Sequence, residues 1–213
     1  VLSLQNGVDN EAELADALSA PRIFGGLTRR IGAHIVSPGH VRATGPCETI
    51  IGHWPNTERA PASPEANDRL DALASAFTAA GIPTELSDDI RTELWRKLII
   101  NNGVNPLAAL LRVETSVLTG DVGLSKMVHH LMAEAAIAAR ADGVRLDDAA
   151  VDAMHHLIST FDSIKPSMLI DRERGRTPEI DAICGVVRDR CPRQGLDAPY
   201  TRSVATLLGW TLQ

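Results

Sequence analysis

The hydrophobic pattern of the chain changes near residue 88, and this change constrains the fold more than any other feature. Before it, short β-like apolar runs and turns are interrupted by helical stretches at 10–19 and 65–80. After it, nearly all apolar residues recur with the period of an amphipathic helix. We therefore predict an α/β domain over residues 1–87 and an all-helical domain over residues 88–213.

The first domain contains several short runs that are typical of strands. They cover residues 1–4, 22–28, 33–36, 41–44, 48–54 and 83–86. The segment "SPGH" at 37–40 has turn residues between two of these runs, which predicts a hairpin. The composition of "ERAPASPEAN" at 58–67 indicates a surface loop.

The second domain contains several helical stretches with recognisable ends. They are expected at about 88–102, 124–142, 147–163, 175–190 and 199–212. Ser87 is expected to cap the first, and Pro106 to break or kink the chain after it. Gly143 is expected to end the second helix, and Thr177 to cap the fourth with Pro178 in its first turn.

The composition excludes two classes of partner. A net charge of −6 and an aromatic content of 3% provide neither a basic surface nor stacking platforms for nucleic acid. No run reaches the ~20 apolar residues of a membrane span, and the apolar start "VLSL" is too short for a signal peptide. We therefore expect a cytoplasmic protein that binds neither nucleic acid nor a membrane.

The cysteines and histidines do not have the spacing of a metal site. Cys47, Cys184 and Cys191 are odd in number and unpaired in spacing, so reduced, structural thiols are expected. His129–His130 and His155–His156 are adjacent pairs, and neighbours on a helix point in different directions. We predict no metal site and place these histidines at surface or partly buried helical positions.

The strongest candidate for chemistry lies in "ELWRKLIINNGVNPLAAL", residues 93–110. Lys97, Asn101 and Asn105 recur every four residues, so a helix would carry them in one line between apolar flanks. A lone lysine on a helix is more often a solvated charge. Because asparagine is a poor helix former, however, two of them in line with a lysine indicate a cleft where substrate oxygens are held.

Three further residues are weaker candidates. Glu179 and Ser167 lie on either side of a charged, irregular segment that leads to a helix N-terminus, a place suited to an anionic substrate. The helix dipole alone would also explain Glu179. Asn6 follows an apparently buried strand in "LQNG", where open α/β sheets bind ligands, although a plain β-turn is the ordinary interpretation.

Three stretches together resemble the ketopantoate reductase family, the NADPH-dependent 2-dehydropantoate 2-reductases. They are "LQNG", "ELWRKLIINNGVNPL", and "PSMLIDRERGRTPEIDAICGVV" followed by "GLDAPY". They occur in the family's order and at suitable spacing over essentially the whole chain. The resemblance implies a dinucleotide-binding α/β domain followed by a helical domain like that of 6-phosphogluconate dehydrogenase.

The resemblance also implies roles for individual residues. Lys97 matches the catalytic lysine that protonates the ketone oxygen, and Asn101, Asn105 and Ser167 match substrate-binding residues. Glu179 matches a glutamate that contacts substrate or cofactor hydroxyls and supports catalysis. Asn6 matches an asparagine near the nicotinamide ribose, so Asn6 and Glu179 are the expected cofactor contacts. The implied reaction is NADPH-dependent reduction of a small 2-oxo acid, such as ketopantoate, in pantothenate and coenzyme A biosynthesis.

The chain departs from the family pattern at two places. It contains no G-x-G-x-x-G turn, and roughly ninety residues that would carry it in a dinucleotide-binding domain are missing from this sequence. We therefore expect only the C-terminal part of a Rossmann-type domain, weak NADPH binding and, through the unpaired sheet edge, a homo-oligomer. The alternative function is a cofactor-less, inactive binding or assembly module. Thr115 also stands where the family has a substrate-contacting asparagine.

Overall fold

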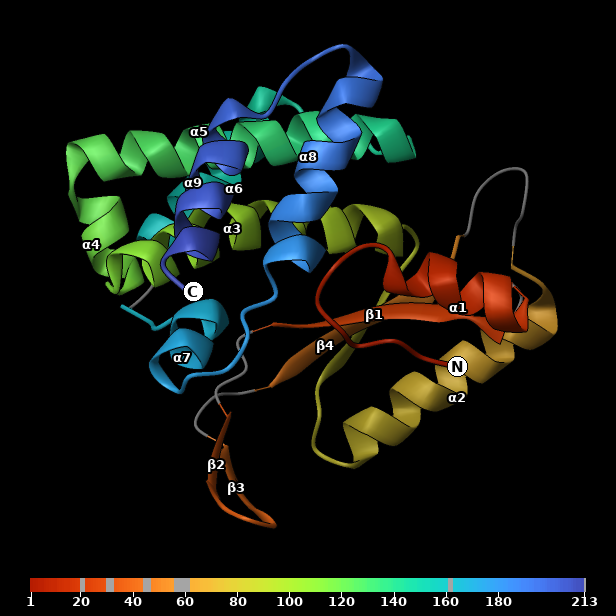
Figure 1. The fold of residues 1–213 in the computed structure, drawn as a ribbon. Coiled ribbons are helices and arrows are strands. Elements are labelled where there is room, and N and C mark those ends of the chain that lie inside the picture. The colour runs from red at the N-terminus through yellow and green to blue at the C-terminus, as the bar shows by residue number, and fades with distance from the viewer. Residues whose placement is uncertain (20–21, 30–32, 44–46, 56–61, 161–162, 213) are drawn as a thin grey trace. The chain divides into compact units, whose positions relative to one another are not determined.

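The computed structural model describes residues 1–19, 22–29, 33–43, 47–55, 62–160 and 163–212 (Figure 1). The chain divides into two compact units, Val1–Leu94 and Trp95–Gln213, and each is described here by itself. The division falls within one helix, α3 (Ile90–Leu111). The boundary at residue 87 stays a prediction.

The first unit is built on a mixed sheet with the strand order β1-β4-β5. Strand β1 (Phe24–Arg29) pairs antiparallel with β4 (Glu48–His53), which pairs parallel with β5 (Thr84–Ser87). The predicted strand at 1–4 is wrong as a full strand, because it forms only a single parallel bridge, from Leu2 to Phe24.

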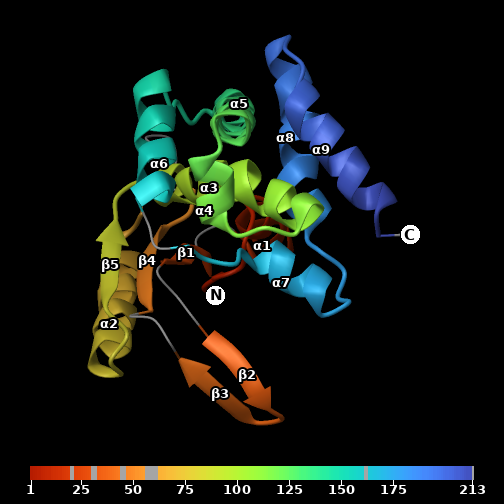
Figure 2. The same cartoon turned by 90° about the vertical axis from the view of Figure 1, so that its left-hand side faces the viewer.

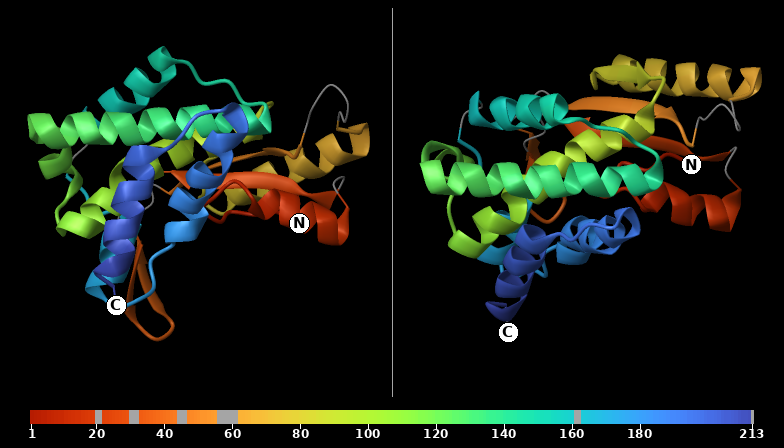
Figure 3. Two further views of the ribbon diagram at one scale, coloured as in Figure 1. Left: turned by 45° about the horizontal axis from the view of Figure 1, so that its top comes forward. Right: turned by 90° about the horizontal axis from the view of Figure 1, so that it is seen from above.

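Helices cover both faces of this sheet. Helix α1 (Asn10–Leu18) and helix α2 (Pro64–Ala79) lie on opposite sides of it (Figure 3, right). On the α2 side, a buried cluster joins strands and helix through Phe24, Ile51, Leu70 and Ala74. On the other side the strands carry glycine, and a Cβ on Gly52 would lie only 2.5 Å from the carbonyl oxygen of Ser87. It would also lie 2.9 Å from Cβ of Ile90, the first residue of α3, so the start of this helix can approach β4 only because position 52 has no side chain.

A separate two-stranded sheet forms the predicted hairpin. Strands β2 (Ala33–Ser37) and β3 (His40–Ala43) pair antiparallel (Figure 2). Gly39 has a φ of +76°, which suits the turn between them. The loop predicted at 58–67 begins in residues outside the described ranges.

The second unit contains helices and loops, and no strand, in the part that the structure describes. Besides most of α3 it contains α4 (Thr115–Gly120), α5 (Val122–Ala139), α6 (Asp148–Thr160), α7 (Ser167–Glu173), α8 (Val186–Arg190) and α9 (Pro199–Trp210). Short turns η2 (Arg140–Asp142) and η4 (Cys191–Gln194) are 3-10 helical, and η3 (Asp181–Gly185) is π-helical. Helix α5 contacts α4, α6, α8 and α9, so it forms the centre of this unit. No helix in the described ranges has both the length and the apolar character of a membrane span.

Helix α3 corrects two predictions. It continues through Pro106 to Leu111, so the helix does not break at this proline, and the kink expected as the alternative stays a prediction. Proline removes one backbone donor, but the residues that follow are buried, with Ala108 and Ala109 fully so, and this packing offsets the lost bond. The N-terminal cap is Asp89 and not Ser87, because the Asp89 carboxylate accepts the backbone N–H of Thr92 at 3.1 Å.

The segment between α6 and α8 also differs from the prediction. Residues 167–173, expected to be irregular, form α7. The next helical stretch begins at Ile180, so Thr177 and Pro178 precede it and do not cap it. The π-helical turn η3 follows, and π turns are rare features that periodicity does not reveal.

Buried polar contacts fix α3, α5 and α9 to one another. Asn102 of α3 is fully buried and donates to the Leu131 carbonyl at 2.8 Å and to Thr201 Oγ1 at 3.0 Å. The carboxylate of Glu134 on α5 accepts the backbone N–H groups of Tyr200 at 2.9 Å and Thr201 at 2.7 Å. The two bonds of Glu134 cap the first turn of α9. The two bonds of Asn102 attach α3, the helix that carries Lys97, to α5 and α9.

Candidate active site

Lys97 is a half-buried cation on α3. Its neighbours Leu94 and Leu98 are buried in the apolar core, and no described residue hydrogen-bonds or ion-pairs with its ammonium. Burial lowers the pKa of Lys97, because removal from water penalises the charged form. An amine with a lowered pKa is a better proton donor near neutral pH than a solvated lysine.

Glu179 acts electrostatically on Lys97. It lies immediately before the helical stretch that begins at Ile180, and its side chain is exposed. Its negative charge raises the pKa of Lys97, but less than burial lowers it. The second unit therefore brings together two predicted residues that are far apart in the sequence.

The two asparagines continue the line of Lys97 along α3. Asn101 is half-buried, and Asn105 is only 4% exposed. Neither carboxamide hydrogen-bonds to a residue that the structure describes, whereas Asn102, one position along, is bonded to α5 and α9. Within the described part of the chain, both carboxamides therefore keep unused hydrogen-bonding groups, and their binding role stays a prediction.

Ser167 is connected to the end of α3 only through the helix that it begins. It is the first residue of α7, and its side chain is exposed. Arg172 of α7 donates to the carbonyl oxygens of Ala109 and, at 3.1 Å, of Leu110. The structure thus attaches α7 to the last turns of α3, beyond Asn105, but gives no contact between Ser167 and the line of polar residues.

Thr115 is used by the fold. It is 1% exposed, its Oγ1 donates to the Ile164 carbonyl at 3.3 Å, and it accepts the Ile164 N–H at 3.1 Å. The hydroxyl therefore joins α4 to the segment before α7. This position supplies no free group to a ligand.

Asn6 belongs to the first unit. It is half-buried, and its backbone carbonyl accepts a hydrogen bond from the Asn10 side chain at 2.9 Å. Gly7 follows with a φ of +107°, which a residue with a side chain rarely adopts. The "NG" pair thus forms a tight bend directly before α1.

The sequence analysis did not find Glu11, in the first turn of α1. Its carboxylate is fully buried, and burial raises its pKa although Ser3 and a backbone amide partly stabilise the charge. Neither carboxylate oxygen makes a hydrogen bond of normal geometry to a described residue. A glutamate in a first helical turn is so common that no sequence signal distinguishes this one.

Two histidines that are distant in sequence lie close together. The rings of His129 on α5 and His155 on α6 are 5.5 Å apart, beside a cavity of about 380 Å³. His129 Nε2 lies 2.8 Å from Asp152 Oδ1, and His155 Nε2 lies 3.0 Å from Ser125 Oγ. The described residues contain no group of three potential metal-ligating side chains.

All three cysteines are free thiols. Burial raises the pKa of Cys184 to about 12 and that of Cys191 to about 11. Both thiols are therefore uncharged at neutral pH and have no nucleophilic role.

Family models match both parts of the chain. The model "Ketopantoate reductase PanE/ApbA C terminal" matches residues 89–210, and the model "Ketopantoate reductase PanE/ApbA" matches residues 1–56. The fold is accordingly that of a two-domain protein with a partial Rossmann-type domain followed by a helical domain. The chain belongs to the ketopantoate reductase family.

Individual relatives agree with this assignment. A 2-dehydropantoate 2-reductase of Pyrococcus abyssi is 30% identical over 100% of this chain and 65% of its own length. The crystal structure of 2-dehydropantoate 2-reductase from Geobacter metallireducens is 32% identical, with a TM-score of 0.86 over 99% of this chain and 67% of that one. A ternary structure of D-mandelate dehydrogenase with NADH and anilino(oxo)acetate is 25% identical, with a TM-score of 0.86 over 100% and 66%. The chain thus spans about two thirds of the length of these relatives.

Proposed function

We propose that the protein catalyses the NADPH-dependent reduction of a small 2-oxo acid to the 2-hydroxy acid, with 2-dehydropantoate as the first candidate substrate. The observation that carries this proposal is the line on α3, where a half-buried ammonium with a lowered pKa is followed by two carboxamides that have no hydrogen-bond partner among the described residues. The names of the relatives support it. The ligands of D-mandelate dehydrogenase, NADH and an oxo acid, support the same chemistry.

Lys97 is the proposed proton donor. Hydride addition to a ketone, supplied by the nicotinamide when it is bound, develops negative charge on the ketone oxygen. An ammonium at that oxygen stabilises the charge and releases its proton to it. Glu179 keeps Lys97 protonated against the effect of burial, so the two residues act as a pair.

The neutral polar residues are assigned to binding. Asn101, Asn105 and Ser167 are proposed to hold the carboxylate and hydroxyl oxygens of the substrate. Carboxamides and a hydroxyl can orient these groups without adding charge near Lys97. The Thr115 hydroxyl is bonded to the backbone of Ile164 and is not assigned to the substrate. We therefore assign the discrimination between different 2-oxo acids to Asn101, Asn105 and Ser167.

The chain contains only part of what a nicotinamide cofactor requires. Asn6 and Glu179 are proposed to contact cofactor hydroxyls, and the tight bend at Gly7 would let a ligand approach the backbone. The 213 residues contain no G-x-G-x-x-G turn for the pyrophosphate, and no phosphate contact is assigned. An inactive binding or assembly module stays the second candidate function.

We further propose that the protein is cytoplasmic and forms homo-oligomers. In the described sheet, β5 is an outer strand that pairs on one side only, with β4. An outer strand is a ready surface for pairing with a second copy. Light scattering at tens of micromolar, on the order of ordinary assay concentrations, tests this point.

The test of the catalytic proposal is the steady-state oxidation of NADPH with 2-dehydropantoate and with a simpler 2-oxo acid. Lys97→Ala should lower kcat by roughly 10²- to 10⁴-fold, the range for a positioned acid. Lys126→Ala, which removes an exposed lysine on α5, is the matched control and should leave kcat unchanged. A Lys97→Ala enzyme with near-normal kcat would reject the proposal, and a wild-type protein without activity would favour the binding module.

A further inference from the structure

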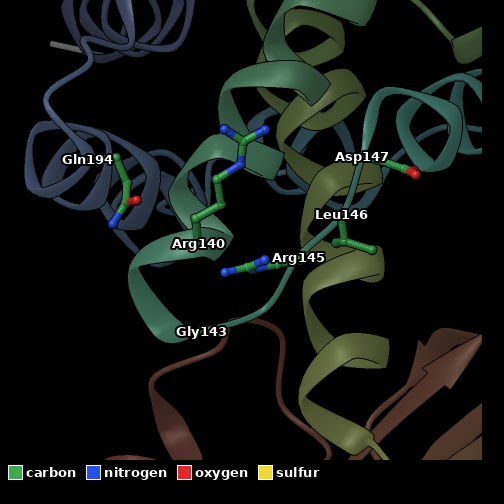
Figure 4. Close-up of a pocket in the computed structure, with 6 residues that line it drawn as sticks. All are labelled: Arg140, Gly143, Arg145, Leu146, Asp147 and Gln194. Atoms are coloured by element: carbon green, nitrogen blue, oxygen red, sulfur yellow. The ribbon is translucent and has the colours of Figure 1, made fainter.

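A second cavity lies in the helical unit, away from the line on α3 described above. Its volume is about 540 Å³, and it is bordered by the turn η2, the loop that leads to α6, and the turn η4. The residues that line it are Arg140, Gly143, Arg145, Leu146, Asp147 and Gln194 (Figure 4). None of them belongs to the proposed reductase machinery, and this inference does not depend on that proposal.

The turn at Gly143 explains why two arginines line one cavity. Gly143 has a φ of +77°, in the left-handed region that favours glycine. Its N–H donates to the Arg140 carbonyl at 3.0 Å, and the Val144 N–H donates to the Ala139 carbonyl at 3.1 Å. This ending reverses the chain, so that Arg140 before the turn and Arg145 after it border the same space.

Neither arginine is neutralised within the described part of the chain. Both are exposed, and neither makes an ion pair or a side-chain hydrogen bond to a described residue. Asp142, the acid between them in the sequence, is engaged elsewhere, with both carboxylate oxygens 2.9 Å from Arg190 Nε. Both arginines therefore keep charges that no ion pair to a described residue neutralises, in a protein whose net charge is −6.

Asp147, the acidic residue in the lining of the cavity, accepts a hydrogen bond from the backbone. Asp147 Oδ1 accepts the Ala150 N–H at 2.9 Å, which caps the start of α6. Its side chain points away from both arginines in Figure 4, and Gln194 of η4 completes the polar part of the lining. Two arginines and a glutamine thus line the cavity, and the one carboxylate in its lining is engaged at the start of α6.

This combination matches the chemistry of phosphate. A guanidinium pairs with phosphate oxygens through two parallel N–H bonds, and a carboxamide adds a neutral donor. A cavity of several hundred cubic ångströms accommodates a small molecule, and Leu146 provides an apolar wall for its uncharged part. We propose that this cavity binds the phosphate groups of a small phosphorylated molecule through Arg140, Arg145 and Gln194.

Inorganic pyrophosphate is a suitable probe in titration calorimetry with the 213-residue chain in a phosphate-free buffer. Arg140→Gln and Arg145→Gln should each weaken its binding by roughly tenfold or more, because each removes a charge-assisted pair. Arg193→Gln is the matched control. Arg193 is next to Gln194 in the sequence, is exposed and does not line the cavity, so this variant removes the same charge from outside the site. This control should change the affinity by less than about twofold.

Three results would overturn the proposal. They are no binding of pyrophosphate to the wild-type chain, an equal loss in Arg193→Gln, and unchanged binding in both cavity variants. Thermal melts of the variants separate a lost site from a lost fold. A second titration in the presence of NADPH identifies the source of the phosphate: displacement indicates the cofactor's own phosphates, whereas independent binding indicates a separate phosphorylated ligand, and either result supports the site.

Discussion

Glu179 raises the pKa of Lys97, while burial of Lys97 lowers it by more. The two residues are far apart in the sequence, and the helical unit brings them within electrostatic reach of each other. The protonation of Lys97 near neutral pH therefore depends on a balance between an apolar surrounding and one carboxylate. A change to the carboxylate should be visible in the pH dependence of catalysis.

Glu179→Gln should move the high-pH limb of the kcat profile to lower pH. Reduction requires protonated Lys97, so kcat falls as the pH rises through the pKa of this lysine in the bound complex. Without the carboxylate only the lowering effect of burial remains, and that pKa drops further. Steady-state kinetics between about pH 6 and 10 measure the limb, a range chosen to span the lowered lysine pKa.

Glu173→Gln is the control for this experiment. Glu173 is an exposed glutamate on α7 that pairs with Lys165 at 2.9 Å and has no assigned role at Lys97. It should leave the limb in place. A limb that does not move in Glu179→Gln would show that the observed pKa belongs to a group other than Lys97.

The line of site residues could be predicted because its signal is local. Lys97, Asn101 and Asn105 repeat at the helical period, so the pattern itself places them on one face of α3. The pairing of Lys97 with Glu179 is different, because it depends on how distant helices pack. No spacing in the sequence encodes it, and only the resemblance to a family pointed to Glu179. Neither the local pattern nor the family resemblance pointed to Glu11, because its burial results from tertiary packing.

Most strands, apart from the one expected at 1–4, and most helices were predicted for the same reason, and the failures in the helical unit have a shared cause. Local rules place a break at Pro106, a helix start at Thr177 and an irregular segment at 167–173. The residues after Pro106 are buried, and this packing stabilises the continuation of α3 to Leu111. The helix α7 is bonded to the end of α3 by two hydrogen bonds from Arg172. Long-range contacts thus outweigh local preference at these places.

Asn105→Ala should change the kinetics in a different way from Lys97→Ala. A neutral contact to a group remote from the hydride contributes almost equally to the ground and transition states, so its loss raises KM and leaves kcat nearly unchanged. Lys97→Ala should instead act mainly on kcat. Because Asn105 is 4% exposed, a thermal melt must accompany the kinetics. A fall in kcat with unchanged KM in Asn105→Ala would contradict its assignment to substrate binding.

Glu134→Ala should destabilise the helical unit strongly. The carboxylate accepts two backbone N–H groups at the start of α9, and its loss leaves both donors without an acceptor. We expect a loss of roughly 2 to 4 kcal/mol in the free energy of unfolding. Asp121→Ala removes an exposed cap, which accepts the Leu124 N–H at 2.9 Å, and should cost only about 1 kcal/mol. Equal effects in urea denaturation would show that the buried cap is not special.

Glu11→Gln should stabilise the protein at neutral pH and should not do so in acid. Burial raises the pKa of Glu11 in the folded state above its ordinary value of 4.5, so folding favours the protonated form. The stability that this group contributes is therefore complete below pH 4.5 and is lost as the pH rises through the folded pKa. Glutamine has the same shape and no charge to bury, so the variant should have a higher free energy of unfolding than the wild type at pH 7. Urea denaturation at about pH 4 and pH 7, on either side of the ordinary carboxyl pKa, measures this difference, with Glu13→Gln on the exposed side of α1 as the control. A gain of the same size at both pH values would mean that the charge of Glu11 is not its cause.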